Sequence, residues 1–252
     1  MGAMISFIIP AYNEDRLLGA TLDALHAAAR AAADDYELIV VDDASTDATA
    51  LVAERHGARV VRVEHRQIAA TRNSGARAAR GELLIFVDAD TVVNDAVVRA
   101  AVHALRDGAA GGGAAVSFDG VVPFYAKLLL PLFVRLFRFA RLAAGCFLFC
   151  SRTAFTAAGG FNEQLFCAEE LAMSQALKRH GRFVVLRESV TTSGRKLRTY
   201  SGRELLRMLG ALVTRGPSAV KQRQGMDIWY GERRVDPHSA IAPEASAKSI
   251  ST

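Results

Sequence analysis

Up to Asp90 the chain alternates short apolar runs, rich in β-branched residues, with longer stretches rich in alanine. Short runs containing Val and Ile are typical of buried strands, whereas Leu18, Leu22 and Leu25 recur at helical spacing. Strands that alternate with helices form a parallel sheet, because each helix must carry the chain back over one face. We therefore expect an α/β protein with a mostly parallel, doubly wound sheet and flanking helices.

The expected elements follow from the same patterns. Strands are predicted at 5–9, 37–41, 59–63 and 83–87, with helices at 15–33, from 45–47 to 56, and at 67–80. Beyond Asp90 the rhythm changes. The predicted order there is helix 94–107, a flexible glycine-rich loop 108–113, strand 114–118, an apolar and basic helix 121–141, strand 145–150, helix 168–180, strand 182–186 and a last helix starting near Tyr200.

Composition places the chain among single-domain, reduced proteins. Its 252 residues are 51% apolar, which is enough for one sizeable core. Cys146, Cys150 and Cys167 form no CxxC pair and have no histidine at metal-ligand spacing, so we expect buried free thiols. Residues 1–4 lead straight into the first strand, and no signal peptide is expected. Together these features predict a cytoplasmic location.

Positive charge is concentrated near the C-terminal end, where residues 195–234 hold ten Lys or Arg and three Asp or Glu. Such a region suits an anionic partner, or is a solvated basic face. In the predicted helix 121–141 the basic residues fall on one side, which fits peripheral binding to an anionic membrane surface or a core helix with its basic stripe in water. Its uncharged run 128–134 is too short to cross a bilayer. The tail 236–252 is expected to be disordered.

Acidic clusters follow two of the predicted strands. Asp42 and Asp43 come directly after strand 37–41, and Asp88 and Asp90 come after strand 83–87. Because parallel strands of an open α/β sheet end at one crevice, these carboxylates should converge there. They repel one another unless a cation or hydrogen-bond donors join them. An Asp-x-Asp triplet can share a hard divalent cation, which would neutralise a diphosphate as a leaving group.

The order of the motifs carries a family resemblance. The motifs are Pro10-Ala-Tyr-Asn-Glu14, Val41-Asp-Asp-Ala-Ser-Thr-Asp47, Thr71-Arg-Asn-Ser-Gly75 and Asp88-Ala-Asp90. With this ordered set the chain resembles the nucleotide-sugar glycosyltransferases of family 2, which have the GT-A fold. The resemblance covers roughly residues 4–200 and implies a nucleotide-sugar-binding half at 4–118 and an acceptor half at 119–200. A basic helical extension at 201–235 would follow.

The resemblance implies roles for the donor-side residues. Asp90 would bind Mg²⁺ or Mn²⁺, and Asp88 would lie near the donor ribose or the metal. Either Asp42 or Asp43 would accept a hydrogen bond from an imide N–H of the nucleobase. Further members of the donor site would be Tyr12 stacking on the base, Pro10 and Glu14 shaping the pocket, and Arg72 with Asn73 lining it. Two structural alternatives remain open: Asp47 as a helix cap and Arg72 in a surface salt bridge.

The acceptor side is matched by Gly159-Gly-Phe-Asn-Glu163 and Ala168-Glu-Glu-Leu171. In the resemblance an acidic residue at this helix start is the general base, which takes the proton of the acceptor hydroxyl. The family's usual Glu-Asp pair is Glu169-Glu170 here, so Glu170 is the predicted base and Glu169 stays an alternative. Both acids could instead only favour a helix N-terminus through its dipole. Arg195, in a basic turn, could close over the diphosphate as part of a lid, or lie in a solvated loop.

The resulting hypothesis is a metal-dependent inverting glycosyltransferase that moves a sugar from a nucleoside-diphosphate sugar to an acceptor hydroxyl. Inversion is implied by the resemblance alone. Expected partners are the donor, an acceptor for which a lipid-linked molecule is one hypothesis, and an anionic membrane surface, but not nucleic acid. The alternatives are a nucleotidyltransferase, whose usual glycine-rich loop after the first strand is missing here, and a catalytically silent nucleotide-sugar-binding scaffold.

Overall fold

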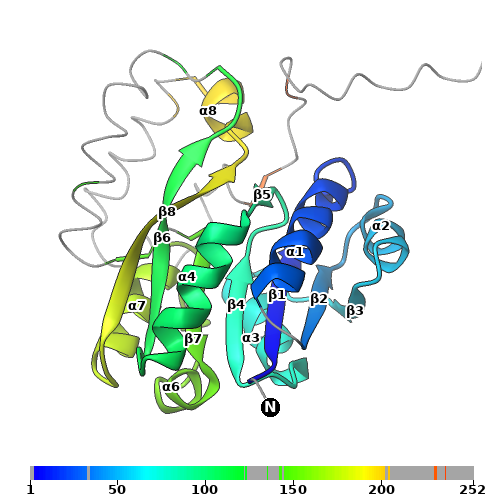
Figure 1. Ribbon diagram of the computed structural model, residues 1–252. Helices are drawn as coiled ribbons and strands as arrows, with labels where there is room; N and C mark the ends of the chain where they lie inside the picture. The colour runs from blue at the N-terminus through cyan, green and yellow to red at the C-terminus, as the bar shows by residue number, and fades with distance from the viewer. Residues whose placement is uncertain are drawn as a thin grey trace, which may run out of the picture.

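The fold is seen in a computed structural model that describes residues 3–32, 35–121, 123, 135, 142–143, 145–201, 204, 230–231 and 236. Within this part of the chain, an eight-stranded sheet has the order β3-β2-β1-β4-β7-β6-β8-β5. Helices cover both of its faces (Figure 1). The α/β class expected from the alternating sequence pattern is confirmed.

The N-terminal half of the sheet is parallel throughout. It consists of β3 (Arg59–Val63), β2 (Tyr36–Asp43), β1 (Ile5–Ala11) and β4 (Leu83–Val87) in that spatial order. The apolar runs predicted all four strands, two of them with their bounds. Because Ala11 lies opposite Asp42 in the register, the polar residues that follow β1 and β2 emerge side by side.

The other half of the sheet mixes strand directions. There β7 (Phe147–Ser151) runs antiparallel to both β4 and β6 (Gly111–Phe118), β6 is parallel to β8 (Phe183–Thr192), and the short β5 (Thr91–Val92) is antiparallel to β8. The expectation of a mostly parallel sheet therefore holds for the first four strands, and the complete sheet is mixed. An antiparallel β7 beside β4 breaks the doubly wound pattern.

Two hydrophobic clusters flank the sheet, one for each layer of helices. On β1 the side chains alternate, with Phe7 and Ile9 in one cluster and Ile8 in the other. The first layer comprises α1 (Leu18–Ala32), α2 (Thr49–Arg55) and α4 (Asp95–Arg106); the second comprises α3 (Ile68–Ala78), α6 (Arg152–Ala157) and α7 (Glu169–Lys178). The three cysteines are buried free thiols, as expected.

The prediction of a glycine-rich loop at 108–113 is wrong over its second half, because Gly111 to Gly113 begin β6. A Cβ at Gly112 would lie 2.1 Å from the carbonyl oxygen of Val184 and 2.3 Å from the ring of Phe149. Glycine is needed here because a neighbouring backbone and a ring approach too closely for any side chain. The run of glycines therefore reflects tight packing inside the sheet.

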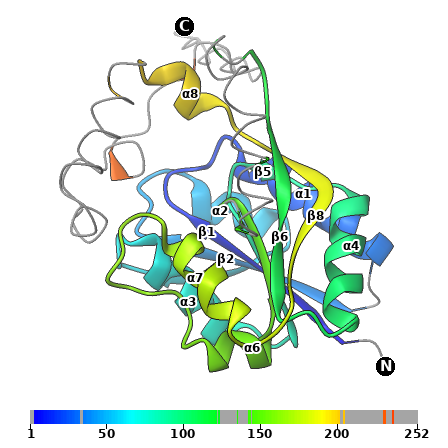
Figure 2. The same ribbon diagram turned by 90° about the vertical axis from the view of Figure 1, so that its left-hand side faces the viewer.

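At the C-terminal end, α8 (Arg195–Thr199) ends where a helix was expected to start. It lies past the end of β8, at the opposite end of the molecule from α6 (Figure 2). The predictions for helix 121–141, the extension 201–235 and the tail 236–252 fall largely outside the described residues. Among the helices that are described, none combines the length and the apolar character needed to cross a bilayer.

Candidate active site

The loops that follow β1 and β2 are joined by hydrogen bonds at the carboxyl end of the sheet. The backbone N–H of Asn13 donates to Ser45 Oγ at 3.0 Å, and that of Glu14 donates to Thr49 Oγ1 at 2.9 Å. The Asp47 carboxylate accepts from the backbone N–H groups of Asp15 and Thr49 at 3.2 and 2.9 Å. Asp47 thus contacts the first residue of α2, but the N-cap position is Ala48, so the alternative of Asp47 as the helix cap is met only in part.

Four described non-glycine residues have positive φ, and all four border the predicted site. They are Asn13 after β1 (51°), Ala44 after β2 (58°), Arg66 before α3 (51°) and Ala168 before α7 (61°). This conformation is uncommon for residues with a Cβ and persists only where the surroundings impose it. The chain therefore accepts backbone strain at the four points where it enters or leaves this region.

The two adjacent aspartates at the end of β2 have different surroundings. Both oxygens of Asp43 are occupied: Oδ1 accepts from the N–H groups of His65 and Arg66, and Oδ2 accepts from Gln67 N–H and Thr71 Oγ1, at 2.7 to 3.2 Å. These four bonds use the acceptor capacity of one carboxylate. For Asp42, Oδ1 accepts from Ser45 N–H at 3.1 Å, and among the described residues no donor reaches Oδ2.

A small cavity opens beside Tyr12. The guanidinium carbon of Arg66 lies 3.6 Å from the centroid of the Tyr12 ring, so one face of this ring is covered by a cation. The cavity is lined by Pro10, Ala11, Tyr12, Asp43, Arg66, Gln67, Ile68, Thr71 and Tyr230. Pro10, Tyr12 and Asp43 were predicted here, whereas Arg66, Gln67 and Tyr230 were missed. The sequence offers no motif for these three, because they come from a loop and from a distant part of the chain.

Arg72 is the centre of the polar network. It was expected to line the donor pocket, with a surface salt bridge as the alternative; the side chain is only 2% exposed, so a surface bridge is excluded. Its Nη1 donates to Glu169 Oε1 at 2.7 Å, and its Nη2 donates to Asp88 Oδ1 at 2.8 Å and to the carbonyl of Gly145 at 2.9 Å. A residue of α3 thereby joins the end of β4 to the start of α7.

The charge state of Arg72 follows from these neighbours. Burial by itself lowers its pKa, but attraction to Asp88, Glu169 and Glu170 outweighs burial and raises the pKa above the usual value. One permanently charged guanidinium therefore faces three carboxyl groups. Next along α3, Asn73 donates to Glu163 Oε1 and to the carbonyl of Phe161. Its role in the structure is to fasten the 159–163 loop to α3.

The paired acids at the start of α7 are also unlike each other. Glu169 is 5% exposed and is held by Arg72. Glu170 is half-buried. Its Oε1 lies so close to Gly145 that a Cβ added there would be 3.2 Å away. Within the described part of the chain, no side chain donates a hydrogen bond to Glu170. Burial, followed by repulsion from Glu169, raises the pKa of Glu170 to about 8. Glu170 can therefore exchange a proton near neutral pH.

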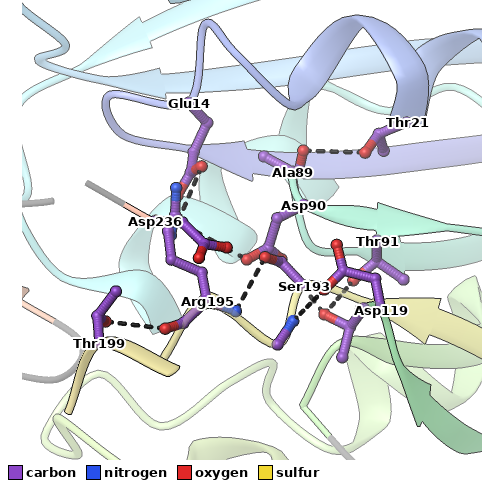
Figure 3. A network of polar contacts seen from close by, with 12 residues as sticks. Glu14, Thr21, Ala89, Asp90, Thr91, Asp119, Ser193, Arg195, Thr199 and Asp236 are labelled. Atoms are coloured by element: carbon purple, nitrogen blue, oxygen red, sulfur yellow. Dashed lines mark hydrogen bonds and ion pairs between the residues drawn. The ribbon is translucent and has the colours of Figure 1, made fainter. Parts of the chain in front are cut away.

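A second buried arginine lies on the other side of Asp90. Figure 3 shows Arg195 pointing toward Glu14 and Asp90. Its Nη2 lies 2.8 and 3.1 Å from the two oxygens of Glu14 and 3.8 Å from Asp90 Oδ2. Thr192 Oγ1 lies 3.4 Å from Asp90 Oδ1. The alternative of a solvated loop for Arg195 is wrong, since only 14% of its side chain is exposed.

The described residues contain no group of three or more His, Cys, Asp or Glu side chains that could hold a metal ion. Within the Asp-x-Asp triplet, Asp88 accepts from Arg72 at 2.8 Å, whereas the guanidinium of Arg195 lies 3.8 Å from Asp90. A single carboxylate suits a metal that takes its other ligands from substrate phosphates and water, as Mg²⁺ usually does. The residues present therefore fit a metal that is held jointly with a diphosphate.

An α/β sheet with an acidic, arginine-bridged site at the carboxyl ends of its strands is typical of α/β proteins that bind a ligand there. Residues 6–158 match the profile of Glycosyl transferase family 2. Because the match covers more than half of the chain, the protein belongs to this family.

Relatives and solved structures agree with this assignment. A dolichyl-phosphate beta-glucosyltransferase from Drosophila melanogaster is 41% identical over 99 residues, which are 34% of this chain and 30% of that protein. The chain spans 23% to 30% of the length of three such curated relatives.

Two solved structures share the fold. The mannosyltransferase PcManGT from Pyrobaculum calidifontis, in complex with GDP-Man and Mn²⁺, gives a TM-score of 0.62 at 19% identity and covers 92% of this chain and 69% of that one. Glucosyl-3-phosphoglycerate synthase from Mycobacterium tuberculosis, in complex with Mn²⁺, UDP and its glucosylated product, gives 0.55 at 23% identity, with 87% and 80% covered.

Proposed function

We propose that this protein transfers a sugar from a nucleoside-diphosphate sugar to an acceptor hydroxyl, with inversion and with the help of a divalent cation. Membership of glycosyl transferase family 2 supports the reaction class. Two structures of similar fold were solved with Mn²⁺ and either GDP-Man or UDP, which supports this type of donor and metal. The acceptor is proposed only as a hydroxyl compound.

The arrangement around Arg72 carries the proposal. Arg72 binds Glu169 and Asp88, so one cation holds both carboxylates in place. Glu170 is the acid of this cluster whose carboxylate receives no such bond from the described residues, and its pKa of about 8 matches proton transfer near neutral pH. We therefore assign Glu170 as the general base and Glu169 as a positioning residue. A base that takes the acceptor proton during one displacement at the anomeric carbon accounts for inversion.

On the donor side, we assign recognition of the nucleobase to the cavity beside Tyr12. The ring of Tyr12 stacks on the base, and Arg66 covers the opposite face of that ring. Asp43 lines this cavity but already accepts four hydrogen bonds, so we assign the imide N–H to the neighbouring Asp42, which lies outside the lining. Asp43 then serves mainly to hold the start of α3.

Asp90 is proposed to hold the cation together with the donor diphosphate. When bound, such an ion supplies positive charge that stabilises the departing nucleoside diphosphate. Arg195, which lies 3.8 Å from Asp90 and is paired with Glu14, is proposed to bind the diphosphate oxygens. A guanidinium is suited to phosphate because its donors form a fixed fork.

The proposal is tested by incubating the protein with UDP-sugars and GDP-sugars, with and without Mn²⁺, and measuring released nucleoside diphosphate by chromatography. We expect release that depends on Mn²⁺, and a loss of about 10²- to 10⁴-fold in Glu170→Gln with nucleotide affinity retained. Glu54→Gln, a change of an exposed glutamate on α2, is the matched control and should release product at the unchanged rate. Nucleotide binding without any release would instead identify a silent scaffold.

A further inference from the structure

Tyr230 lies far along the chain from every motif of the site, yet it lines the cavity beside Tyr12. It shares this lining with residues from the end of β1 and from the start of α3, among them Pro10 and Ile68. Its own ring contacts Phe166 edge to face, with centroids 5.8 Å apart and planes at 74°. Tyr230 therefore fills the space between the cavity and the loop that leads to α7.

The surroundings of Tyr230 connect both halves of the site. Burial, and then repulsion from the charge of Glu169, raises the pKa of its hydroxyl. The loop that carries Phe166 is itself fastened to the cavity, because Gln67 Nε2 donates to the carbonyl oxygens of Glu163 and Leu165 at 3.2 and 2.6 Å. The ring of Tyr230 thus borders the proposed nucleobase cavity on one side and, on the other, the loop that leads to α7, the helix that carries Glu170.

A second residue from the same part of the chain, Asp236, is bound near the diphosphate side. Its carboxylate accepts three hydrogen bonds from Arg198, whose Nη2 also donates to Asp119 Oδ1 at 3.0 Å. The same oxygen of Asp119 accepts from the N–H of Gly194 at 2.6 Å. Arg198 and Asp236 are 5% and 6% exposed, so this is a buried pair. In Figure 3 Asp236 lies beside Arg195 and Glu14.

We propose that Tyr230 and Asp236 complete the donor site: Tyr230 forms a wall of the nucleobase cavity, and Asp236 positions the turn that carries Arg195. The ligand class is a nucleoside diphosphate, so this inference rests on the proposed function. Tyr230 acts by direct contact with the base or ribose. Asp236 acts through Arg198 and Asp119, which hold the N–H of Gly194 and hence the start of α8.

The test is calorimetric titration of the full chain with UDP, GDP and inorganic pyrophosphate, each in the presence of Mn²⁺. Tyr230→Ala should weaken binding of the nucleoside diphosphate that the wild-type protein prefers by about tenfold and leave pyrophosphate affinity within twofold, because pyrophosphate does not reach the cavity. Tyr230→Phe, which keeps the ring, should restore the affinity. Asp236→Asn should weaken nucleotide and pyrophosphate alike, since it acts on the Arg195 side.

Tyr36→Ala is the matched control for a lost aromatic ring. Tyr36 begins β2, at the far end of that strand from the site. Its substitution should lower the melting temperature, because the ring contact with Phe7 is lost, without changing nucleotide affinity. If Tyr230→Ala binds the nucleoside diphosphate like wild type, or loses pyrophosphate to the same degree, the role of Tyr230 is overturned. A wild-type protein that binds neither UDP nor GDP would overturn the proposed function itself, which is a separate result.

Discussion

Replacing Glu170 by Gln should change how the stability of this protein depends on pH. The pKa of Glu170 is raised to about 8, by burial first and by the charge of Glu169 second. In the unfolded chain both causes vanish, and the pKa of the carboxyl returns to its ordinary value of about 4.5. Between these two pH values the folded protein retains a proton that the unfolded chain has lost. By linkage, the free energy of unfolding must fall as the pH rises through this window.

The size of the effect follows from the same two values. One pKa unit corresponds to about 1.4 kcal/mol, so ionising Glu170 in the fold costs about 5 kcal/mol above pH 8. The cost is absent below about pH 4.5 and complete above about pH 8. A glutamine has no proton to lose. Glu170→Gln should therefore resemble wild type in stability near pH 5 and exceed it by several kcal/mol at about pH 8.5.

Urea denaturation of both proteins at intervals from about pH 5 to pH 8.5 measures this directly, since midpoint and slope give the free energy of unfolding. Glu54→Gln, on the surface of α2, should follow the wild-type curve at every pH. A constant difference between wild type and Glu170→Gln over the whole range would refute the reasoning. The same pKa predicts that kcat/KM rises with pH up to about 8, because a general base must be ionised to act.

Four further substitutions test other contacts of the site and sheet. Asp43→Asn should destabilise the fold by about 2–4 kcal/mol, because it removes a carboxylate oxygen that accepts hydrogen bonds from the start of α3. Asp42→Asn should instead weaken nucleotide binding in calorimetry, with little change in melting temperature. Arg72→Met leaves the buried Glu169 and the partly exposed Asp88 without their cation and should cost about 3–5 kcal/mol in denaturant unfolding. Gly112→Ala should cost about 1–3 kcal/mol or more, through its clash with the β8 backbone. An unchanged unfolding midpoint in either of the last two would contradict the contact concerned.

Much of the fold could be predicted from local pattern. The strands at 59–63 and 83–87 were predicted with the bounds they have in the structure. The run 83–87 is apolar and buried along its whole length, whereas 59–63 is a partly exposed run of valines that includes two arginines. The first helices also followed from leucine spacing. Prediction failed at Gly111 to Gly113, where local composition indicates a loop and the packing of Val184 and Phe149 demands a strand without side chains. The residues whose close packing requires glycine here are distant in the sequence, so a local pattern does not reveal them.

The candidate site divides in the same way. Sequence motifs identified Tyr12, Asp42, Asp43, Asp88 and Asp90, because each follows a recognisable strand. They gave no sign of Arg66 or Tyr230, which reach the cavity from a loop and from beyond position 200. The family resemblance favoured Glu170 as the base, but the motifs could not exclude Glu169, an identical side chain next to it.

By itself, then, the sequence determined the class of fold, the end of the sheet that carries the site and the family to which the chain belongs. These depend on periodicity and on short motifs, which are local. Only the tertiary structure decided that Arg72 is buried between Asp88 and Glu169, which leaves Glu170 to titrate near neutral pH. The charge state of a side chain depends on its burial and on its neighbours in space. Arg72 and Glu169 are 97 positions apart in the sequence and are brought together only by folding.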